Sequence, residues 1–383
     1  MKLGAWLLAD LGLERNPYAE RGLVALAVIA CVLGMISTLR WWLQKPPAIV
    51  SNDEERGWPF MKRTLLGLAQ AASGVLVVLV LTWIATPTPK PPEGWSLIRP
   101  PHEVHTLALQ NELIWAGGKE GLFAVNRTTG SLVHTTLQSR DLRDVRALLV
   151  ENDTLWIACT AGLHRWDGKE LQKLTPPGLT DTGPITSLKR TRDGALWAGA
   201  YLGAWRITAD HWDWVGENKG LRLPVVDTIF EDKSGALWFA SKEPEAPGLW
   251  RYAGGRWELF ERTQGIVHPA INDMIEDHRG TLWIACGFGG AGTAQFFDGQ
   301  KWTDEAVQGL EEKKIRSLFE DRSRRLWFCS EYDGAAIRDG TSWRRLTMSE
   351  GLPGNEIKVM AEDADKVLWL GNERGLGRII GYK

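Results

Sequence analysis

Short apolar segments separated by turn residues repeat along the chain from residue 93 to the C-terminus. In one repeat, the segments 185–188, 196–200, 203–207 and 212–215 each have the length of a strand. The pair Asp193-Gly194, between the first two segments, is a hairpin signal. Because the segments are too short for helices, the pattern predicts four antiparallel strands per repeat.

The centre of each repeat is an apolar residue followed by tryptophan. The pair occurs seven times, and successive tryptophans are 41, 41, 41, 45, 44 and 42 residues apart. This period is typical of four-stranded propeller blades, so we expect an all-β, seven-bladed β-propeller over residues 93–383. The chain holds 21 tryptophans against 10 phenylalanines, an excess that a repeated core position explains. The predicted core tryptophans are Trp115, Trp156, Trp197, Trp238, Trp283, Trp327 and Trp369.

The last repeat is shorter than the others. Only 14 residues follow Trp369, which leaves no room for a fourth strand, whereas a strand-like segment at 93–98 precedes the first repeat. We expect this segment to be the outer strand of the last blade. It would then close the ring and leave no open sheet edge.

The segments 229–240 and 275–285 contain Glu-Asp, a glycine turn and Leu-Trp, and they resemble the two-component regulator propeller repeat. The resemblance covers residues 93–383 and implies an extracytoplasmic propeller, as in bacterial hybrid sensor kinases. In that family the propeller precedes a membrane span and a kinase follows. Here apolar segments come first and no kinase segment is found, so we expect no signal output from this chain alone.

Two uncharged apolar segments, 22–39 and 65–86, precede the repeats. As helices they would reach roughly 27 and 33 Å, close to the roughly 30 Å of a bilayer core. We predict an interfacial helix at 1–21, transmembrane helices at 22–42 and 64–86, a basic loop at 43–63, and a proline-rich linker at 87–92. A cleaved signal peptide is the alternative for the first segment, but no small-x-small site follows it.

Small residues at a four-residue spacing occur in both segments: Ala30 and Gly34 in the first, Gly67 and Ala71 in the second. Such residues let helices approach closely in lipid, either to each other or to a partner's helix. Five basic residues lie between positions 40 and 63, more than on either other flank. The positive-inside rule then places this loop in the cytoplasm and the propeller in the periplasm, anchored in a bacterial inner membrane.

Composition and motifs argue against several classes of function. The net charge of −2 provides no basic field for nucleic acid. No zinc-type spacing of Cys and His, nucleophile elbow or phosphate loop occurs, so we expect no catalytic residue, metal or cofactor. The turn residues Asp193, Asp232 and Asp277 resemble the Asp boxes of sialidases. Their repetition favours a structural role, accepting turn N–H groups, over calcium binding or glycan processing.

The connections between second and third strands are enlarged in three consecutive repeats, at 241–248, 287–293 and 331–333. Surface loops vary without function, but they also carry binding sites. The candidate partner-binding residues are Lys242, Glu243, Phe288, Tyr332 and Asp333. We therefore expect a non-enzymatic, membrane-anchored accessory or scaffold subunit that contacts other membrane proteins. The alternative is a small-molecule sensor that signals through a separate kinase.

Overall fold

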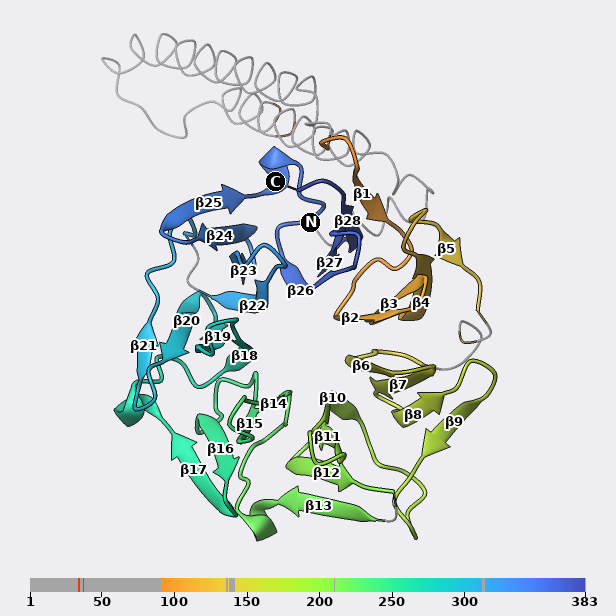
Figure 1. Ribbon diagram of the computed structural model, residues 1–383, viewed down its shortest axis with the longest axis vertical. Coiled ribbons are helices and arrows are strands. Elements are labelled where there is room, and N and C mark those ends of the chain that lie inside the picture. Colours follow the sequence, from red (N-terminus) through yellow and green to blue (C-terminus); the bar gives the residue numbers. More distant parts are fainter. Residues whose placement is uncertain are drawn as a thin grey trace, which may run out of the picture. The chain divides into compact units, whose positions relative to one another are not determined.

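The computed structural model describes residues 34, 37, 91–135, 137, 142–209, 211–311 and 314–382. The chain divides into two units, 1–90 and 91–383. The second unit is a ring of seven four-stranded antiparallel sheets (Figure 1). The expected all-β, seven-bladed propeller is confirmed.

The predicted membrane segments lie outside the described residues, except for Gly34 and Ser37, which are helical and exposed. Ala30, Gly67 and Ala71, the loop at 43–63 and the interfacial helix at 1–21 are likewise outside them. Within the described ranges, no helix is both long enough and apolar enough to cross a membrane.

The blades follow one another in chain order around the ring. Blade 1 contains β2 (Thr106–Gln110), β3 (Leu113–Gly118), β4 (Gly121–Asn126) and β5 (Leu132–Val133). Blade 2 contains β6 (Ala147–Glu151), β7 (Thr154–Cys159), β8 (Gly162–Trp166) and β9 (Leu171–Leu174). Blade 3 contains β10 (Ile185–Arg190), β11 (Leu196–Ala200), β12 (Gly203–Ile207) and β13 (Trp212–Gly216). Blade 4 contains β14 (Thr228–Glu231), β15 (Leu237–Ala240), β16 (Leu249–Ala253) and β17 (Arg256–Phe260). Blade 5 contains β18 (Ile271–Glu276), β19 (Leu282–Phe288), β20 (Ala291–Phe297) and β21 (Trp302–Asp304). Blade 6 contains β22 (Ile315–Glu320), β23 (Leu326–Ser330), β24 (Ala335–Asp339) and β25 (Ser342–Leu346), and blade 7 contains β26 (Ile357–Glu362), β27 (Leu368–Asn372), β28 (Gly375–Ile379) and β1 (Trp95–Ile98).

The ring is closed by the strand that precedes blade 1. In Figure 1, β1 lies along β28 at the outer edge of blade 7, and the two strands pair antiparallel from Trp95 opposite Ile379 to Ile98 opposite Leu376. Trp95 packs against the core formed by blades 6 and 7. The two ends of the propeller are therefore held together by one sheet.

The core tryptophans are fixed by hydrogen bonds as well as by packing. In blades 4 to 7, an aspartate six residues earlier accepts the indole N–H with one carboxylate oxygen at 2.8–3.0 Å. Its other oxygen accepts backbone N–H groups of the turn between the first two strands. The pairs are Asp232–Trp238, Asp277–Trp283, Asp321–Trp327 and Asp363–Trp369. The expected turn-binding role of the aspartates is confirmed for Asp232 and Asp277, and the bond to tryptophan explains why the repeat retains both residues.

In blades 1 and 2 the indole N–H of the core tryptophan is also hydrogen-bonded by a side chain, but across a shorter turn. The acceptors there are Gln110 for Trp115, at 2.9 Å, and Glu151 for Trp156, at 2.7 Å, each five residues before the indole. Trp156 is half-buried, whereas the other six core tryptophans are buried.

Blade 3 departs from this arrangement. Thr191 stands six residues before Trp197, and the buried Trp197 Nε1 has no hydrogen-bond partner among the described residues. Asp193, which the sequence pattern placed with Asp232 and Asp277, lies two residues later in its turn. It accepts the Ala195 N–H and pairs with Arg206 instead. The expected acceptance of a turn N–H is thus confirmed for Asp193 as well. Its alignment with Asp232 and Asp277 was wrong, because the turns share a glycine but not the position of the acid.

Short connections carry the repeated Gly-Leu or Gly-Ile pairs between blades. In three of them a 3-10 turn, η2 (Glu217–Lys219), η3 (Arg262–Gln264) or η4 (Met348–Glu350), ends at a glycine with φ of 94–107°. That left-handed conformation favours glycine. The next residue, Leu221, Ile266 or Leu352, is buried, so each pair turns the chain and then anchors it in the core.

The enlarged connection expected in blade 5 is absent. β19 extends to Phe288 and β20 begins at Ala291, leaving a two-residue turn of Gly289 and Gly290 with φ of 57° and 82°. Two consecutive positive φ values are typical of tight hairpins. Blade 5 therefore has longer strands rather than an irregular loop, whereas blades 4 and 6 have the longer connections 241–248 and 331–334.

Candidate functional site

One face of the ring gathers the first ends of the innermost strands and the connections between second and third strands, since neighbouring strands are antiparallel. We call it the front face. There, backbone bonds join consecutive blades. The residue two positions before an innermost strand donates its N–H to a carbonyl at the end of the preceding blade's second strand. Examples are Val104 to Asn372, Val145 to Gly118 and Val226 to Ala200, at 2.9–3.0 Å. These bonds make the front face a fixed frame.

Charged side chains line this face near the propeller axis, at or just before the starts of β2, β6, β22 and β26. Figure 1 shows these strands innermost around the centre of the ring. The group, here called the axial ring, forms a continuous series of contacts through blades 6, 7, 1 and 2. Its members are Arg316, Glu356, Lys358, Glu103, His105, Asp144 and Arg146.

Contacts within the axial ring are short. Arg316 and Arg146 each lie 2.7 Å from a carboxylate, Glu356 and Asp144 respectively. Glu103 contacts Lys358 and lies 3.1 Å from His105. Burial raises the pKa of Glu103, but hydrogen bonds from Lys358 and His105 outweigh it and hold the pKa at about 2. Each charge is thus matched inside the ring, which stabilises the frame.

Lys242 lies beside this ring but has no ion-pair partner among the described residues. Its backbone N–H donates to Asp227 Oδ2 at 2.9 Å, and its ammonium interacts at longer range with Asp227 and Asp273. The residue is exposed, but surrounding side chains displace much of its water, and this desolvation lowers its pKa. Burial also raises the pKa of Asp273 to about 6, against hydrogen bonds from Leu318 and Met274.

A second group lies between blades 5 and 6. The ammonium of Lys314 is 5.6 Å from the centre of the Phe288 ring and 2.6 Å from a Glu331 carboxylate oxygen. Lys314 is buried, so this ion pair fixes Phe288 relative to the 331–334 connection. Phe288 is nevertheless 51% exposed and Tyr332 is 60% exposed. The structure therefore presents two exposed aromatic side chains, of which Phe288 lies beside the Lys314 ammonium and Tyr332 follows Glu331 in the chain.

The five residues selected from the sequence have different roles. Phe288 and Tyr332 belong to the aromatic group, and Lys242 belongs beside the axial ring. Glu243 is exposed, and its N–H donates to Ser241 Oγ at 3.2 Å. Asp333 accepts the Glu311 N–H at 2.8 Å and lies 3.5 Å from Arg345; its carboxylate therefore holds the connection between blades 5 and 6.

Sequence reasoning missed two exposed apolar residues in blade 3. Tyr201 and Leu202, in the turn between β11 and β12, are 57% and 69% exposed. Leu202 also lines a groove of about 450 Å³ with Trp214, Leu221 and Pro224. The available signal was the occurrence of two large apolar residues at a turn, where blade 2 has Thr160 and Ala161.

One repeat matches a known family model. Residues 351–374 match the two component regulator propeller, which supports the resemblance noted from the sequence. No curated protein matches the chain significantly.

Solved structures share the fold at low identity. The extracellular domain of a protein assigned to the hybrid two component systems of B. thetaiotaomicron is 16% identical with a TM-score of 0.62, over 77% of this chain and 42% of that one. Virginiamycin B lyase from Staphylococcus aureus, with quinupristin, is 13% identical with a TM-score of 0.58, over 74% and 98%. YCF48 bound to D1 peptide is 15% identical with a TM-score of 0.58, over 76% and 98%. The chain spans about two fifths of the first domain, and at these identities the likeness establishes the fold.

The described residues contain no group of three or more Cys, His, Asp and Glu side chains arranged to hold a metal. Cys286 and Cys329 are buried, and burial raises their thiol pKa values to about 11 and about 12. Thiols held protonated in this way are poor nucleophiles. They fill small core positions on β19 and β23.

Proposed function

We propose that the propeller is a non-enzymatic docking module that binds a protein subunit of a membrane complex on its front face. The observation that carries this proposal is the pair of exposed rings, Phe288 beside the buried Lys314 ammonium and Tyr332 next to Glu331 in the chain, with Lys314 and Glu331 forming an ion pair. Exposed aromatic side chains on a preorganised base lose little entropy on binding, and such residues dominate protein interfaces.

The charged residues also favour the front face as the docking surface. Because the axial ring is internally paired, Lys242 beside it is a front-face cation that can bind a carboxylate on a partner. Tyr201 and Leu202 extend the apolar surface to blade 3. Exposed aromatic residues and a charged residue on the same face have the composition of an interface core and rim.

The proposed setting is extracytoplasmic. The matched repeat family and the extracellular domains with the same fold support this placement, and the predicted segments at 22–42 and 64–86 would anchor the module in the inner membrane. The predicted role is then an accessory or scaffold subunit. Signalling through a separate kinase is the second candidate, favoured by the small-molecule cleft described below.

The docking role predicts a selective loss of binding in a front-face variant. Changing Phe288 and Tyr332 together to Ala should weaken retention of the partner by about 1–3 kcal/mol per ring, because interface aromatics contribute that much when truncated. Retention is measured by co-purification of the full-length chain from membranes in mild detergent. The melting temperature should stay the same, since neither ring is buried.

Thr160→Ala is the matched control. Thr160 occupies the equivalent connection of blade 2, is exposed, and donates only to the Arg143 carbonyl on its own chain. The Thr160→Ala variant should retain the partner fully. If the double variant also retains every co-purifying membrane protein, the front-face aromatic group is not the docking surface.

A further inference from the structure

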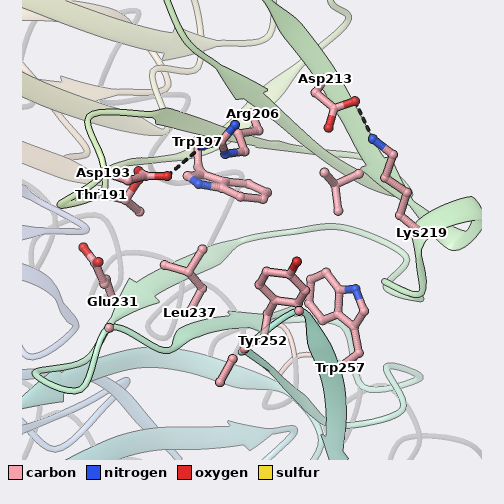
Figure 2. A pocket seen from close by; sticks show the side chains of 15 residues that line it. Thr191, Asp193, Trp197, Arg206, Asp213, Lys219, Glu231, Leu237, Tyr252 and Trp257 are labelled. Atoms are coloured by element: carbon pink, nitrogen blue, oxygen red, sulfur yellow. Dashed lines mark hydrogen bonds and ion pairs between the residues drawn. The ribbon is translucent and has the colours of Figure 1, made fainter.

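A cleft of about 540 Å³ separates blades 3 and 4 (Figure 2). Neither Phe288 nor Tyr332 lines it. Trp197 and Leu237 stand on opposite walls, and Tyr252 and Trp257 lie toward its outer side. The Tyr252 and Trp257 rings are 4.7 Å apart between centroids. The volume is within the range of small-molecule sites, about 300–1,000 Å³.

The polar groups of the cleft form internal pairs. Asp193 and Arg206 are 2.7 Å apart on the blade 3 wall, and Asp213 contacts Lys219; Figure 2 shows both pairs at the cleft. Glu231 pairs with Arg192 at 3.5 Å. Because each charge has an opposite neighbour, a charged ligand would have to break an existing pair. A neutral ligand can instead donate to the carboxylates and accept from the cations without disturbing them.

The wall of the cleft also contains an unsatisfied donor. Trp197 lines the cleft and is 3% exposed, and its Nε1–H has no acceptor among the described residues. In the six other blades the equivalent indole is bonded by an acid or amide side chain. Leaving a buried donor unpaired is unfavourable. The Asp-to-Thr difference at position 191 therefore has a cost that an oxygen atom of a ligand would remove.

We propose that this cleft binds a neutral, ring-shaped compound that carries several hydroxyl groups, a carbohydrate or similar cyclic polyol. The apolar face of the ring packs on Tyr252 and Trp257. Hydroxyl groups bridge the Asp193–Arg206 and Asp213–Lys219 pairs, donating to each carboxylate and accepting from each cation. A ligand oxygen takes the Trp197 N–H once the Thr191 side chain turns aside. This site is separate from the front face and does not depend on the docking role.

Binding of neutral sugars to the full-length chain tests the site. Calorimetry would use methyl glycosides and neutral oligosaccharides, with glucuronic acid and glucosamine as charged counterparts. The detergent should have polyoxyethylene head groups, because a maltoside could itself occupy the cleft. We expect at least one neutral sugar to bind, and its charged counterpart to bind at least tenfold more weakly, about 1.4 kcal/mol.

Three variants locate the binding. Trp257→Ala should weaken it tenfold or more, and Asp193→Asn, which keeps the side-chain shape at a 53% exposed position, should weaken it several-fold. Thr191→Asn should weaken binding while raising the melting temperature, since its amide oxygen accepts the Trp197 N–H as Gln110 does in blade 1. Tyr332→Ala, on the front face, should leave sugar binding unchanged.

Several results would overturn the proposal. They are no heat from any neutral sugar at millimolar concentration, preference for a charged counterpart, or affinity that survives both Trp257→Ala and Asp193→Asn. Affinity lost in Tyr332→Ala but kept in the cleft variants would place the sugar on the front face instead. Loss of the protein partner in Phe288→Ala/Tyr332→Ala is independent of all these outcomes.

Discussion

Deleting residues 93–100 should lower the free energy of unfolding of the propeller by several kcal/mol, out of the roughly 5–15 kcal/mol typical of a domain. The deletion removes β1, so that β28 becomes an open edge and blade 7 loses a strand. It also uncovers the core of blades 6 and 7, where Trp95 packs near Tyr382 at 6.1 Å between ring centroids. Urea unfolding followed by tryptophan fluorescence measures the loss.

Adding the missing strand back as a peptide distinguishes loss of β1 pairing from a general disturbance of the fold by the deletion. A synthetic peptide of residues 93–100 should restore most of the lost stability when added in excess, because a free strand can pair with an open sheet edge. A peptide of the same composition in scrambled order should not. An unchanged unfolding midpoint in the deletion would show that β1 does not hold the ring closed.

Changing Asp277 to Ala should cost about 3 kcal/mol. The carboxylate is 4% exposed, and it accepts the Arg279 and Thr281 N–H groups and the Trp283 indole at 2.8–3.0 Å. Each buried donor left unpaired costs about 1–3 kcal/mol. Asp298, in an exposed turn of the same blade, accepts two backbone N–H groups but no indole. Asp298→Ala should cost less than half as much; equal losses would contradict the role of the indole bond.

The reciprocal change should stabilise blade 3. Thr191→Asp places a carboxylate where four other blades have one, and it should raise the free energy of unfolding by about 1 kcal/mol, as one net hydrogen bond does. A melting temperature that falls instead would mean that repulsion from Asp193 and Glu231 exceeds the gain.

Much of the fold could be predicted from local sequence because each blade repeats the same requirements. The apolar-Trp pairs gave the number of blades, and the short last repeat indicated the role of residues 93–98. The Asp–Trp bond was also accessible, since Asp232, Asp277, Asp321 and Asp363 all stand six residues before a core tryptophan. Matching the turns by their acidic residues, and not by the glycine that stands three residues before Trp197, Trp238 and Trp283, hid this bond and misplaced Asp193.

The candidate sites were less accessible because they combine distant residues. The axial ring joins Glu103 to Lys358, 255 positions later, and no local motif marks either residue. Phe288 was selected as part of an irregular loop, yet it is exposed because β19 extends past the core before a Gly-Gly turn. Its partner Lys314 lies in the next blade. The cleft between blades 3 and 4 depends on packing between two sheets, which strand periodicity does not describe.

Site-specific photo-crosslinking in intact cells tests the docking proposal most directly. A benzophenone amino acid is placed at Tyr332 on the front face, or at Ala364 in the exposed turn between β26 and β27 at the opposite ends of the strands. We expect irradiation to yield one defined adduct with a membrane protein from position 332, and none from position 364. No adduct from position 332, or equal adducts from both positions, would contradict the assignment of the front face as the docking surface.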